Sequence, residues 1–481
     1  MNDKQRHIHL VSICGVGMAP LAVLLKKAGY HVTGSDKAAY PPMCDVLRAA
    51  GIEIQKGFAP EHLDPQPDLV IVGNAVPRDN PEALRVEQDG LAKMSFPEAV
   101  AEFFIRDRRS LVVSGTHGKT TTTGMLARVL DDAQLRPGYL IGGLVSDLGE
   151  FARAGTGEYF VIEGDEYDSA YFDKRPKFVH YRPHAAIVTS IEYDHADIYD
   201  DMEAIRVAFA GLAGQVPPEG FIIVNGDYTD IVDTIKPNTA ARYISYGMES
   251  KNDWTVVGLE SSAQGISFEA RYRDKVEARV SLQVPGEMNA LNALAVFAMC
   301  RELGLPDQPI LFGLSQFQGA ARRQEKIGEV DGIVIIDDFA HHPTAVGLTL
   351  DAIRASYVGH RLVAVFEPRS NTSRRSIFQE QYTAALERAD LTVVSAVYAK
   401  ENDPLSADQS LSTDRIVADL IAAGRSAWTA DGPDAILPRL AAELRSGDVV
   451  VCMSNGAFGG LPKRLVAELS SGAASELTIQ P

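Results

Sequence analysis

The sequence predicts an α/β protein of three domains, each built on a mostly parallel sheet. The chain has 481 residues, which is enough for about three domains of ordinary size. Three segments each begin with an apolar strand pattern, continue through a turn rich in glycine or polar residues, and end in a helical pattern. Strands that alternate with helices are typical of parallel sheets that are covered on both faces.

We expect the domains to span residues 1–107, 108–317 and 318–481. The first opens with the strand, turn and helix pattern of residues 7–36, and "DLVIVGNAV" follows as a further strand. The helical stretch "SFPEAVAEFFIRDRR" then leads into a basic connector. The second domain opens with "SLVVSGTHGKT", and the third follows "QFQGAARRQEKIGEVDG". Later strand-like runs such as "HRLVAVF" and "GDVVVCM" continue the pattern to the C-terminal region.

The composition is that of an ordinary soluble globular protein, with 46% hydrophobic and 23% charged residues. A net charge of −18 argues against a nucleic acid partner, because neutralising a phosphate backbone needs concentrated positive charge. The four cysteines form no CxxC pair, so neither a disulfide framework nor a zinc site is expected. We find no membrane-spanning run and no signal peptide pattern. We therefore expect a cytoplasmic protein without a membrane partner. We also expect a monomer or weak homodimer, although none of these features determines the oligomeric state.

The first glycine loop, "CGVGMAP", partly matches a dinucleotide-binding fingerprint. Gly15 and Gly17 are followed by Asp36 about 20 residues later, but Pro20 replaces the third glycine. The loop is therefore either a plain tight turn or a site that holds a pyrophosphate at a helix N-terminus. Asp36 is a candidate partner for a ribose or for a nearby backbone group. A dehydrogenase is the least favoured function.

The second glycine loop, "SGTHGKTTTT", predicts a nucleotide-phosphate site. Gly118, Lys119 and Thr120 fit the end of the P-loop pattern, although Val113 occupies its first glycine position. In such a loop the lysine reaches the β- and γ-phosphates and the hydroxyl lies on Mg²⁺. The alternative is an incidental Gly-Lys turn. The candidate nucleotide-binding residues of this loop are Gly115, Thr116, His117, Gly118, Lys119, Thr120 and Thr121.

Further motifs follow in a fixed order: "VIEGDEYDSAYFD", "TSIEYDHADIYD", "GEMNALNALA", "FQGAARRQEKIG" and "IIDDFAHHPTAV". In order and spacing they resemble the Mur ligase family of ATP-dependent amide-bond-forming enzymes, over essentially the whole chain. The resemblance implies a Rossmann-like N-terminal domain, a central P-loop ATPase domain and a Rossmann-like C-terminal domain that binds the amine substrate. It also implies ATP and Mg²⁺ as cofactors.

The carboxylates of "VIEGDEYD" lie at a strand end next to the P-loop. Such a run is usually a solvated loop, but this position favours a Mg²⁺ site. The resemblance implies that Glu163 is the metal ligand that bridges the substrates and that His195 lies at a second Mg²⁺. We thus expect Lys119, Glu163 and His195 to be catalytic, and Thr120, Glu163 and His195 to bind metal.

The remaining nucleotide contacts are implied by the resemblance alone. Asn289 and Asn292 lie on one helix face and would approach the nucleotide; the alternative is a helix surface or a cap. One of two arginines would contact ATP phosphates across the domain junction, and one of two aspartates would hold the ribose. These candidates are Arg322 or Arg323, and Asp337 or Asp338.

The N-terminal domain resembles the type that binds UDP-N-acetylmuramate. Two branches of the family use this donor: one adds L-alanine, and the other adds a preformed tripeptide recovered from old cell wall. The stretches "GSDKAAYPPM", "GNAVPRDNPE" and "FEPRSNTSRR" resemble the second branch. The candidate UDP-sugar residues are Gly15, Gly17, Met18, Asp36 and Asn74. The candidate amine-substrate residues are Arg369, Ser370, Asn371 and Thr372.

The implied reaction is a two-step ligation of L-Ala-γ-D-Glu-meso-diaminopimelate to UDP-N-acetylmuramate in peptidoglycan recycling. The donor carboxylate attacks the γ-phosphate of ATP to give an acyl phosphate, and the tripeptide amine then expels phosphate. One alternative is the L-alanine ligase of the same family. An alternative from a different class is a non-catalytic nucleotide-binding protein.

Overall fold

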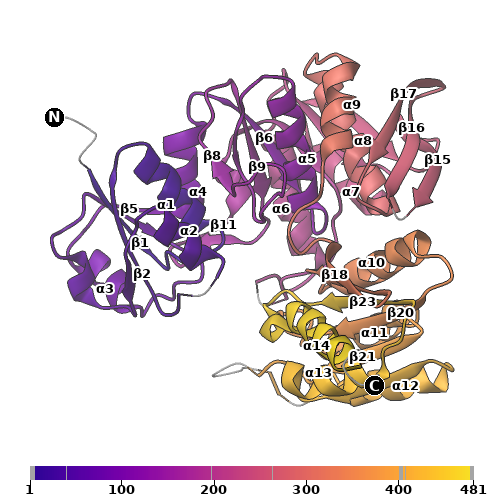
Figure 1. Ribbon diagram of the computed structural model, residues 1–481. Coiled ribbons are helices and arrows are strands. Elements are labelled where there is room, and N and C mark those ends of the chain that lie inside the picture. Colours follow the sequence, from indigo (N-terminus) through magenta and orange to yellow (C-terminus); the bar gives the residue numbers. More distant parts are fainter. Residues whose placement is uncertain are drawn as a thin grey trace.

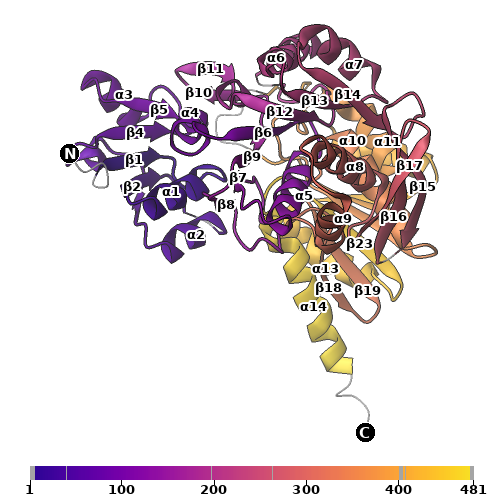
Figure 2. The same ribbon diagram turned by 90° about the horizontal axis from the view of Figure 1, so that it is seen from above.

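The structure is a computed structural model that describes residues 6–39, 41–196, 198–262, 264–399, 405–406 and 408–476, with side chains to residue 471. The structure is built on three large sheets, one in each part of the chain. In Figure 1 the indigo N-terminal part lies at one end of the central part, and the orange-to-yellow C-terminal part lies beneath the central part. Figure 2 shows the N-terminal part extending away from the other two. The predicted α/β class is confirmed.

The N-terminal sheet is fully parallel and has the strand order β3-β2-β1-β4-β5. The order reverses beside β1, and ligands in open α/β sheets bind at the carboxyl edge of such a point. The elements are β1 (His7–Val11), α1 (Met18–Lys27), β2 (His31–Asp36), α2 (Met43–Ala49), β3 (Ile54–Lys56), η2 (Pro60–Leu63), β4 (Leu69–Val72), α3 (Pro81–Gln88), β5 (Lys93–Ser95), α4 (Phe96–Val100) and the π-helical turn η3 (Ala101–Ile105).

The central sheet has ten strands in the order β17-β16-β15-β14-β13-β12-β6-β9-β7-β8. Its middle is parallel, so the carboxyl ends of β9, β6 and β12 lie side by side. The elements up to β12 are β6 (Arg109–Ser114), α5 (Lys119–Asp132), β7 (Gly138–Leu140), β8 (Ala152–Arg153), β9 (Tyr159–Gly164), the separate hairpin β10 (Asp168–Ala170) and β11 (Asp173–Pro176), η4 (Lys177–His180) and β12 (Pro183–Val188). The rest are α6 (Met202–Gln215), β13 (Phe221–Asn225), α7 (Thr229–Ile235), η5 (Lys236–Asn238), β14 (Arg242–Gly247), β15 (Trp254–Ser262), β16 (Gly265–Tyr272), β17 (Lys275–Leu282), α8 (Glu287–Glu302) and α9 (Asp307–Gln316).

The C-terminal sheet has the order β18-β19-β23-β20-β21-β22 and is parallel except for the edge strand β18. Its elements are β18 (Glu325–Val330), β19 (Ile333–Asp338), α10 (Pro343–Ser356), β20 (Arg361–Phe366), η6 (Ser376–Phe378), α11 (Gln379–Leu386), β21 (Leu391–Ser395), α12 (Thr413–Ala422), β22 (Ser426–Ala430), α13 (Gly432–Glu443), β23 (Asp448–Met453), η7 (Phe458–Gly460) and α14 (Leu461–Glu476).

The connection between the central and C-terminal sheets stays attached to the central one. Phe317 is fully buried in the core that α5, α8 and α9 share. Ala320 pairs with Val145, and the backbone N–H of Ala321 donates to the carbonyl of Leu144 at 2.7 Å. The chain therefore leaves the central part just before the two candidate arginines. Among the described residues, no helix is long and apolar enough to cross a membrane.

Candidate active site

The P-loop connects β6 to α5, and its glycines are required by geometry. Gly118 caps α5 with φ of 82°, and Gly115 has φ of 137°. A Cβ atom on Gly115 would lie 2.1 Å from Oγ1 of Thr189. Both positions therefore need the backbone freedom of glycine, and the loop can bring backbone N–H groups close to a phosphate.

Lys119 lies at the centre of a buried charge pair. Its Nζ donates to the carbonyl of Gly115 at 2.6 Å and to Oε2 of Glu166 at 2.9 Å. Burial acts to lower the pKa of Lys119, but the charges of Glu166 and Asp165 outweigh it and hold the pKa above its usual value. Glu166 is only 2% exposed. The family resemblance pointed to Glu163 in this run of carboxylates, and Glu166 was not predicted as a site residue.

Thr120, at the start of α5, and Glu163, near the end of β9, lie side by side next to the P-loop. The Thr120 hydroxyl donates to Oε2 of Glu163 at 3.1 Å, and the N–H of Gly142 donates to Oε1 at 2.5 Å. Burial, together with the nearby Asp165, raises the pKa of Glu163. A hydroxyl and a carboxylate are the hard oxygen donors that suit Mg²⁺, so this pair fits the predicted metal.

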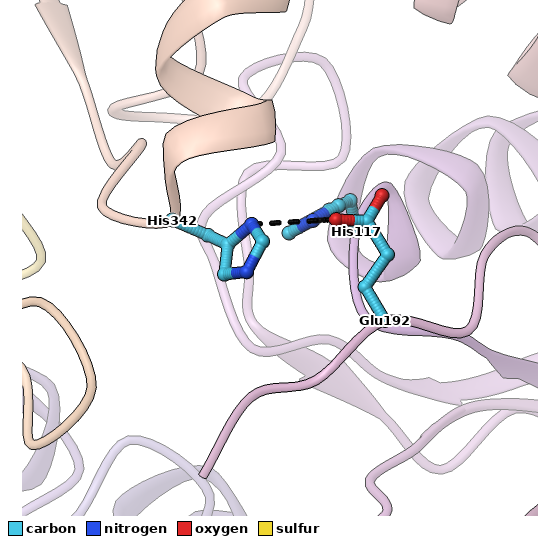
Figure 3. Close-up of side chains that lie close together, drawn as sticks. All are labelled: His117, Glu192 and His342. Atoms are coloured by element: carbon cyan, nitrogen blue, oxygen red, sulfur yellow. Dashed lines mark ion pairs between the residues drawn. The ribbon is translucent and has the colours of Figure 1, made fainter. Parts of the chain in front are cut away.

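A second, partly buried cluster joins the P-loop to the C-terminal domain. His117 and His342 each place a ring nitrogen 3.5 Å from Oε2 of Glu192 (Figure 3). The hydroxyl of Thr344 donates to the same oxygen at 2.6 Å. His117 was expected as part of the P-loop, whereas Glu192 and His342 were not predicted as site residues. Little in the sequence indicated a role for these two residues. Glu192 immediately precedes the "YDH" motif, and His342 is the N-cap of α10.

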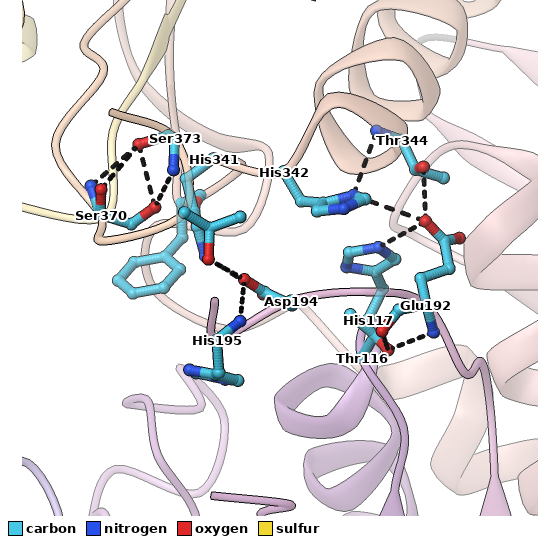
Figure 4. Close-up of polar contacts among 12 residues, drawn as sticks. Thr116, His117, Glu192, Asp194, His195, His341, His342, Thr344, Ser370 and Ser373 are labelled. Carbon is cyan, nitrogen blue, oxygen red and sulfur yellow. Dashed lines mark hydrogen bonds and ion pairs between the residues drawn. The ribbon is translucent and has the colours of Figure 1, made fainter. Parts of the chain in front are cut away.

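Asp194 connects His195 to the C-terminal domain (Figure 4). It accepts from the backbone N–H of His195 at 2.7 Å and from the hydroxyl of Thr372 at 2.5 Å. Burial acts to raise the pKa of Asp194, but His341 and His195 outweigh it and hold the pKa well below its usual range. His195 has φ of 53°, and its Nε2 lies 3.6 Å from Glu166. Its role as a metal ligand stays a prediction.

A cavity of about 320 Å³ brings His195 together with the predicted amine-substrate residues. Arg369 holds its guanidinium 3.7 Å from the ring centre of Tyr398, and its backbone N–H donates to Ser373 at 3.0 Å. The lining residues are Asp194, His195, His341, Arg369, Ser370, Asn371, Thr372, Tyr398 and Asn455. Four residues that follow β20 thus share one cavity with a residue that follows β12.

The two candidate asparagines lie in the first turns of α8, next to the P-loop. A Cβ atom on Gly118 would be 2.9 Å from Oδ1 of Asn292. The amide of Asn289 donates to the carbonyl of Pro285 at 2.6 Å. Asn292 also lines a small cavity of about 50 Å³ with His117. Asn292 is therefore within reach of a nucleotide on the loop, whereas the Asn289 amide also serves its own helix.

The two candidate arginines point to different partners. Arg323 places Nη2 3.5 Å from Oγ1 of Thr120. Arg322 donates to Asp337 at 3.2 Å and to the carbonyl of Ser454 at 2.6 Å. The geometry favours Arg323 as the arginine that faces the P-loop.

The two candidate aspartates also have separate partners. Asp337 pairs with Arg322. Asp338 accepts hydrogen bonds from the backbone N–H groups of Gln324 and Ala340, each at 2.7 Å. Burial raises the pKa of both carboxyls. The choice between them as the ribose partner stays open.

The candidate UDP-sugar residues gather at the carboxyl edge of the N-terminal sheet. Gly15 and Gly17 follow β1, Asp36 ends β2, and the exposed Asn74 follows β4. Asp36 accepts from the backbone N–H of Cys14 at 2.8 Å, which is the backbone role that we considered for it. A Cβ atom on Gly17 would be 2.8 Å from the Phe96 ring. Met18 begins α1 and is 5% exposed.

Comparison with protein families matches three descriptions along the chain. Residues 7–108 match "Mur ligase family, catalytic domain", residues 113–300 match "Mur ligase middle domain", and residues 322–456 match "Mur ligase, glutamate ligase domain". The three matches follow the three sheets in order.

Curated relatives cover nearly the whole chain. The UDP-N-acetylmuramate–L-alanyl-γ-D-glutamyl-meso-2,6-diaminoheptandioate ligase of Haemophilus influenzae is 38% identical, over 96% of this chain and 99% of its own. The protein of the same name from Escherichia coli is 37% identical, over 97% and 99%. A UDP-N-acetylmuramate–L-alanine ligase from Carboxydothermus hydrogenoformans is 33% identical, over 97% of each chain.

Two solved structures share the whole architecture. A murein peptide ligase from Psychrobacter arcticus has a TM-score of 0.72 at 34% identity and covers 96% of this chain and 98% of its own. A UDP-N-acetylmuramate–alanine ligase from Thermotoga maritima has a TM-score of 0.79 at 25% identity and covers 97% and 99%. The backbone alone does not separate the two activities, so the separation rests on side chains.

Proposed function

The chain belongs to the Mur ligase family of ATP-dependent amide-bond-forming ligases, and from that premise we propose that it joins L-alanyl-γ-D-glutamyl-meso-diaminopimelate to UDP-N-acetylmuramate. The relatives named for this reaction are more similar to the chain than the L-alanine ligase described above. A tripeptide released from old cell wall would thereby return to peptidoglycan synthesis.

The observation that carries this proposal is the cavity shared by His195 and the four residues after β20. A tripeptide with several carboxylates needs a planar cation and amide hydrogen bonds. Arg369 can bind a carboxylate with two parallel hydrogen bonds, and Asn371 offers both a donor and an acceptor. The Tyr398 ring holds the guanidinium in one orientation. L-Alanine would leave most of these groups unused.

The first step is a phosphoryl transfer, which requires negative charge to be stabilised while it moves between oxygens. The donor carboxylate attacks the γ-phosphate of ATP, and ADP leaves with the electron pair of the broken bond. Lys119 would neutralise phosphate charge, and Arg323 would add a second cation from the C-terminal domain. Thr120 and Glu163 would hold Mg²⁺, which supplies further charge neutralisation when bound.

The second step forms the amide bond. The tripeptide amine attacks the acyl carbon, phosphate leaves, and the amine loses a proton. Because the amine cavity is lined by residues of both the central and the C-terminal domain, it is complete only while the domains are together. Contacts such as Thr372 to Asp194 support this arrangement, which would also keep water from the acyl phosphate.

We further propose that the protein works in the cytoplasm on small molecules, as a monomer or weak homodimer. The four cysteines are free and buried, as suits a reducing compartment. The acidic net charge of −18 gives no support to a nucleic acid partner.

The deciding experiment measures phosphate release with UDP-N-acetylmuramate, ATP and either the tripeptide or free L-alanine. We expect efficient reaction with the tripeptide and poor use of L-alanine. Faster reaction with L-alanine would move the chain to the alternative branch. Phosphate release that does not require both donor and amine would contradict the ligase assignment.

A further inference from the structure

His117, Glu192 and His342 together have the geometry of a metal-ion site that is separate from the predicted Mg²⁺ ligands. One ligand atom from each residue lies within 4.8 Å of the others. Both imidazole nitrogens lie 3.5 Å from Oε2 of Glu192, which is longer than an ordinary N–H···O hydrogen bond. Figure 3 shows the three side chains converging from two domains.

The hydrogen bonds around His342 leave Nδ1 without a proton. Its Nε2 lies 3.2 Å from the carbonyl of Tyr193, and a carbonyl can only accept, so Nε2 carries the proton. Nδ1 therefore presents a lone pair toward Glu192. The same lone pair accepts from the backbone N–H of Thr344 at 3.4 Å, as the cap of α10. That hydrogen bond is long, and a bound metal ion would replace it. Burial lowers the pKa of His342 to about 4, so the ring is neutral near pH 7.

The facing groups on the central domain are also ready to bind a cation. Nε2 of His117 is buried and has no hydrogen-bond partner among the described residues. Burial acts to raise the pKa of Glu192, but His117 and Thr344 outweigh it and lower the pKa to about 2. The carboxylate of Glu192 thus faces one ring nitrogen of each histidine at 3.5 Å. A cation would relieve that contact.

The spacing matches zinc-class coordination. Zinc binds nitrogen and oxygen ligands at about 2.0–2.2 Å, and tetrahedral geometry then separates two ligands by about 3.4 Å. The two measured separations are 3.5 Å. Two histidines and one glutamate also form a recognised zinc set with one open position. Mg²⁺ prefers oxygen ligands and octahedral geometry, so imidazole disfavours it here.

The surroundings supply the second layer of contacts that metal ligands usually have. A metal-bound histidine commonly donates its other N–H to a backbone carbonyl, as His342 does to Tyr193. The ligand carboxylate of Glu192 is itself hydrogen-bonded to the hydroxyl of Thr344 at 2.6 Å. These contacts fix the orientation of two of the three ligands.

The cluster is reachable and has room for a fourth ligand. Glu192 and His342 line a cavity of about 610 Å³ between the central and C-terminal domains. Glu192 and His117 line the small cavity of about 50 Å³ beside α8. The latter volume holds a few waters at most, since one water needs about 10–15 Å³. An ion can enter from the larger cavity, and water can complete its coordination.

A second His and carboxylate group makes a useful comparison. Glu98, Asp173 and His180 also lie close together. There Arg175 donates to both oxygens of Asp173, at 2.9 and 2.8 Å, and His180 lies 2.9 Å from the same carboxylate. A cation already neutralises this group, so it needs no metal ion.

We propose that His117, Glu192 and His342 bind a zinc-class divalent ion that ties the P-loop domain to the C-terminal domain. This site differs from the Mg²⁺ pair of Thr120 and Glu163 and does not depend on the ligase assignment. It revises our expectation that the chain has no zinc site, which was based on cysteine spacing alone. A metal ion bound at this site would hold the central and C-terminal domains together and hinder their separation.

Co²⁺ is the probe, because it acquires strong visible absorption only in tetrahedral or similar low-coordinate sites. The full chain, stripped of metal, is titrated with Co²⁺ in excess Mg²⁺. We compare the wild type with His342→Asn, which keeps a capping side chain for α10, and with Glu192→Gln, which keeps an acceptor for Thr344. His180→Asn is the matched control in the second group.

We expect one equivalent of tetrahedral Co²⁺ in the wild type and in His180→Asn. Both cluster variants should lose the band or bind at least about tenfold more weakly, the loss seen even when only supporting contacts of a metal site are removed. Circular dichroism checks that each variant is folded. If His342→Asn does not fold, the result for Glu192→Gln decides the question. Absence of the band in the wild type, or an unchanged band in the folded cluster variants, would overturn the proposal.

Discussion

The hydroxyl of Thr372 donates a hydrogen bond of 2.5 Å to the carboxylate of Asp194 and so joins two domains. Both residues are buried, at 2% and 6% exposure. Asp194 immediately precedes His195, and Thr372 lies in the loop that carries Arg369. The contact therefore sets the position of the proposed amine-binding loop relative to the predicted metal-ligand segment.

Thr372→Val should weaken this junction while keeping the side-chain shape. The buried Asp194 carboxylate loses a donor, at a cost of about 1–3 kcal/mol. We expect the KM for the tripeptide to rise several-fold and kcat to fall, with a smaller change in the KM for ATP. Steady-state kinetics measure the three constants. Thr383→Val is the control, since that hydroxyl bonds only within α11; equal effects of both variants would contradict a role for the junction.

Lys119→Ala should abolish turnover, and circular dichroism checks that the variant is folded, because the buried Glu166 carboxylate loses its ion-pair partner. The amine contacts Gly115 and Glu166, and its removal takes away the cation proposed to face the phosphates. We expect phosphate release to fall at least about a hundredfold, as for loss of a transition-state charge contact. Lys326→Ala serves as the control, because Lys326 forms an exposed pair with Glu329. Near-wild-type turnover in folded Lys119→Ala would refute the ATP assignment of this loop.

Glu163→Gln should sharply raise the Mg²⁺ requirement. Glutamine keeps one acceptor oxygen, which can serve either Gly142 or Thr120 but not both, and it lacks the charge that attracts a hard cation. We expect the Mg²⁺ concentration for half-maximal rate to rise about tenfold or more, or activity to be lost. Asp168→Asn changes a carboxylate of the same run that pairs with Lys174, and it should leave the requirement unchanged. An unaltered Mg²⁺ titration in Glu163→Gln would make Glu163 an ordinary loop carboxylate.

The sequence predicted the parts of the site that are local in the chain. The P-loop from Gly115 to Thr121 could be predicted because each role follows from spacing within one turn. Glu166 could not be ranked, since its contact with Lys119 depends on the neighbouring placement of β6 and β9. Glu192 and His342 lie 150 residues apart, and only the docking of α10 brings them together.

The fold, like the site, was predictable where it depends on local sequence pattern. The alternation of strands and helices identified an α/β fold of three units, and the structure has three large, mostly parallel sheets. The order of ten strands in the central sheet was not predictable, because strand neighbours depend on long-range pairing rather than on local pattern. The asparagines show the same limit: their helix was expected, but only the structure places Asn292 against Gly118.

Glu82 should make the stability of the N-terminal domain depend on pH. It is fully buried and accepts from Ser35 at 2.6 Å and from His62 at 2.7 Å. Burial acts to raise the pKa of Glu82, but the neighbouring His9 and the hydrogen bonds from Ser35 and His62 outweigh it and lower the pKa below 4.5. The stabilisation is therefore complete above pH 4.5 and is lost as the pH falls through the folded-state pKa.

Glu82→Gln tests this relationship through the melting temperature as a function of pH. The variant should be less stable than the wild type near neutral pH, and the difference should shrink as the pH is lowered below 4.5. Glu61→Gln, on the exposed side of η2, is the control. A difference between wild type and Glu82→Gln that stays constant with pH would contradict the lowered pKa.

Arg369→Ala should raise the KM for the tripeptide far more than the KM for ATP. The guanidinium stacks on Tyr398 at the cavity that also contains His195, whereas ATP is proposed to bind on the other domain. Loss of a two-point carboxylate contact should cost at least about tenfold in KM, since a charged hydrogen bond contributes roughly 1.5–3 kcal/mol.

Arg369→Lys separates substrate binding from support of the loop. Lysine keeps the charge but not the planar fork, so we expect a KM for the tripeptide between those of the wild type and Arg369→Ala. If Arg369 only braces its loop against Tyr398, both variants should instead lower the melting temperature and change the two KM values alike. Initial rates at varied tripeptide and varied ATP, with Arg279→Ala on the exposed face of β17 as the control, decide between these outcomes.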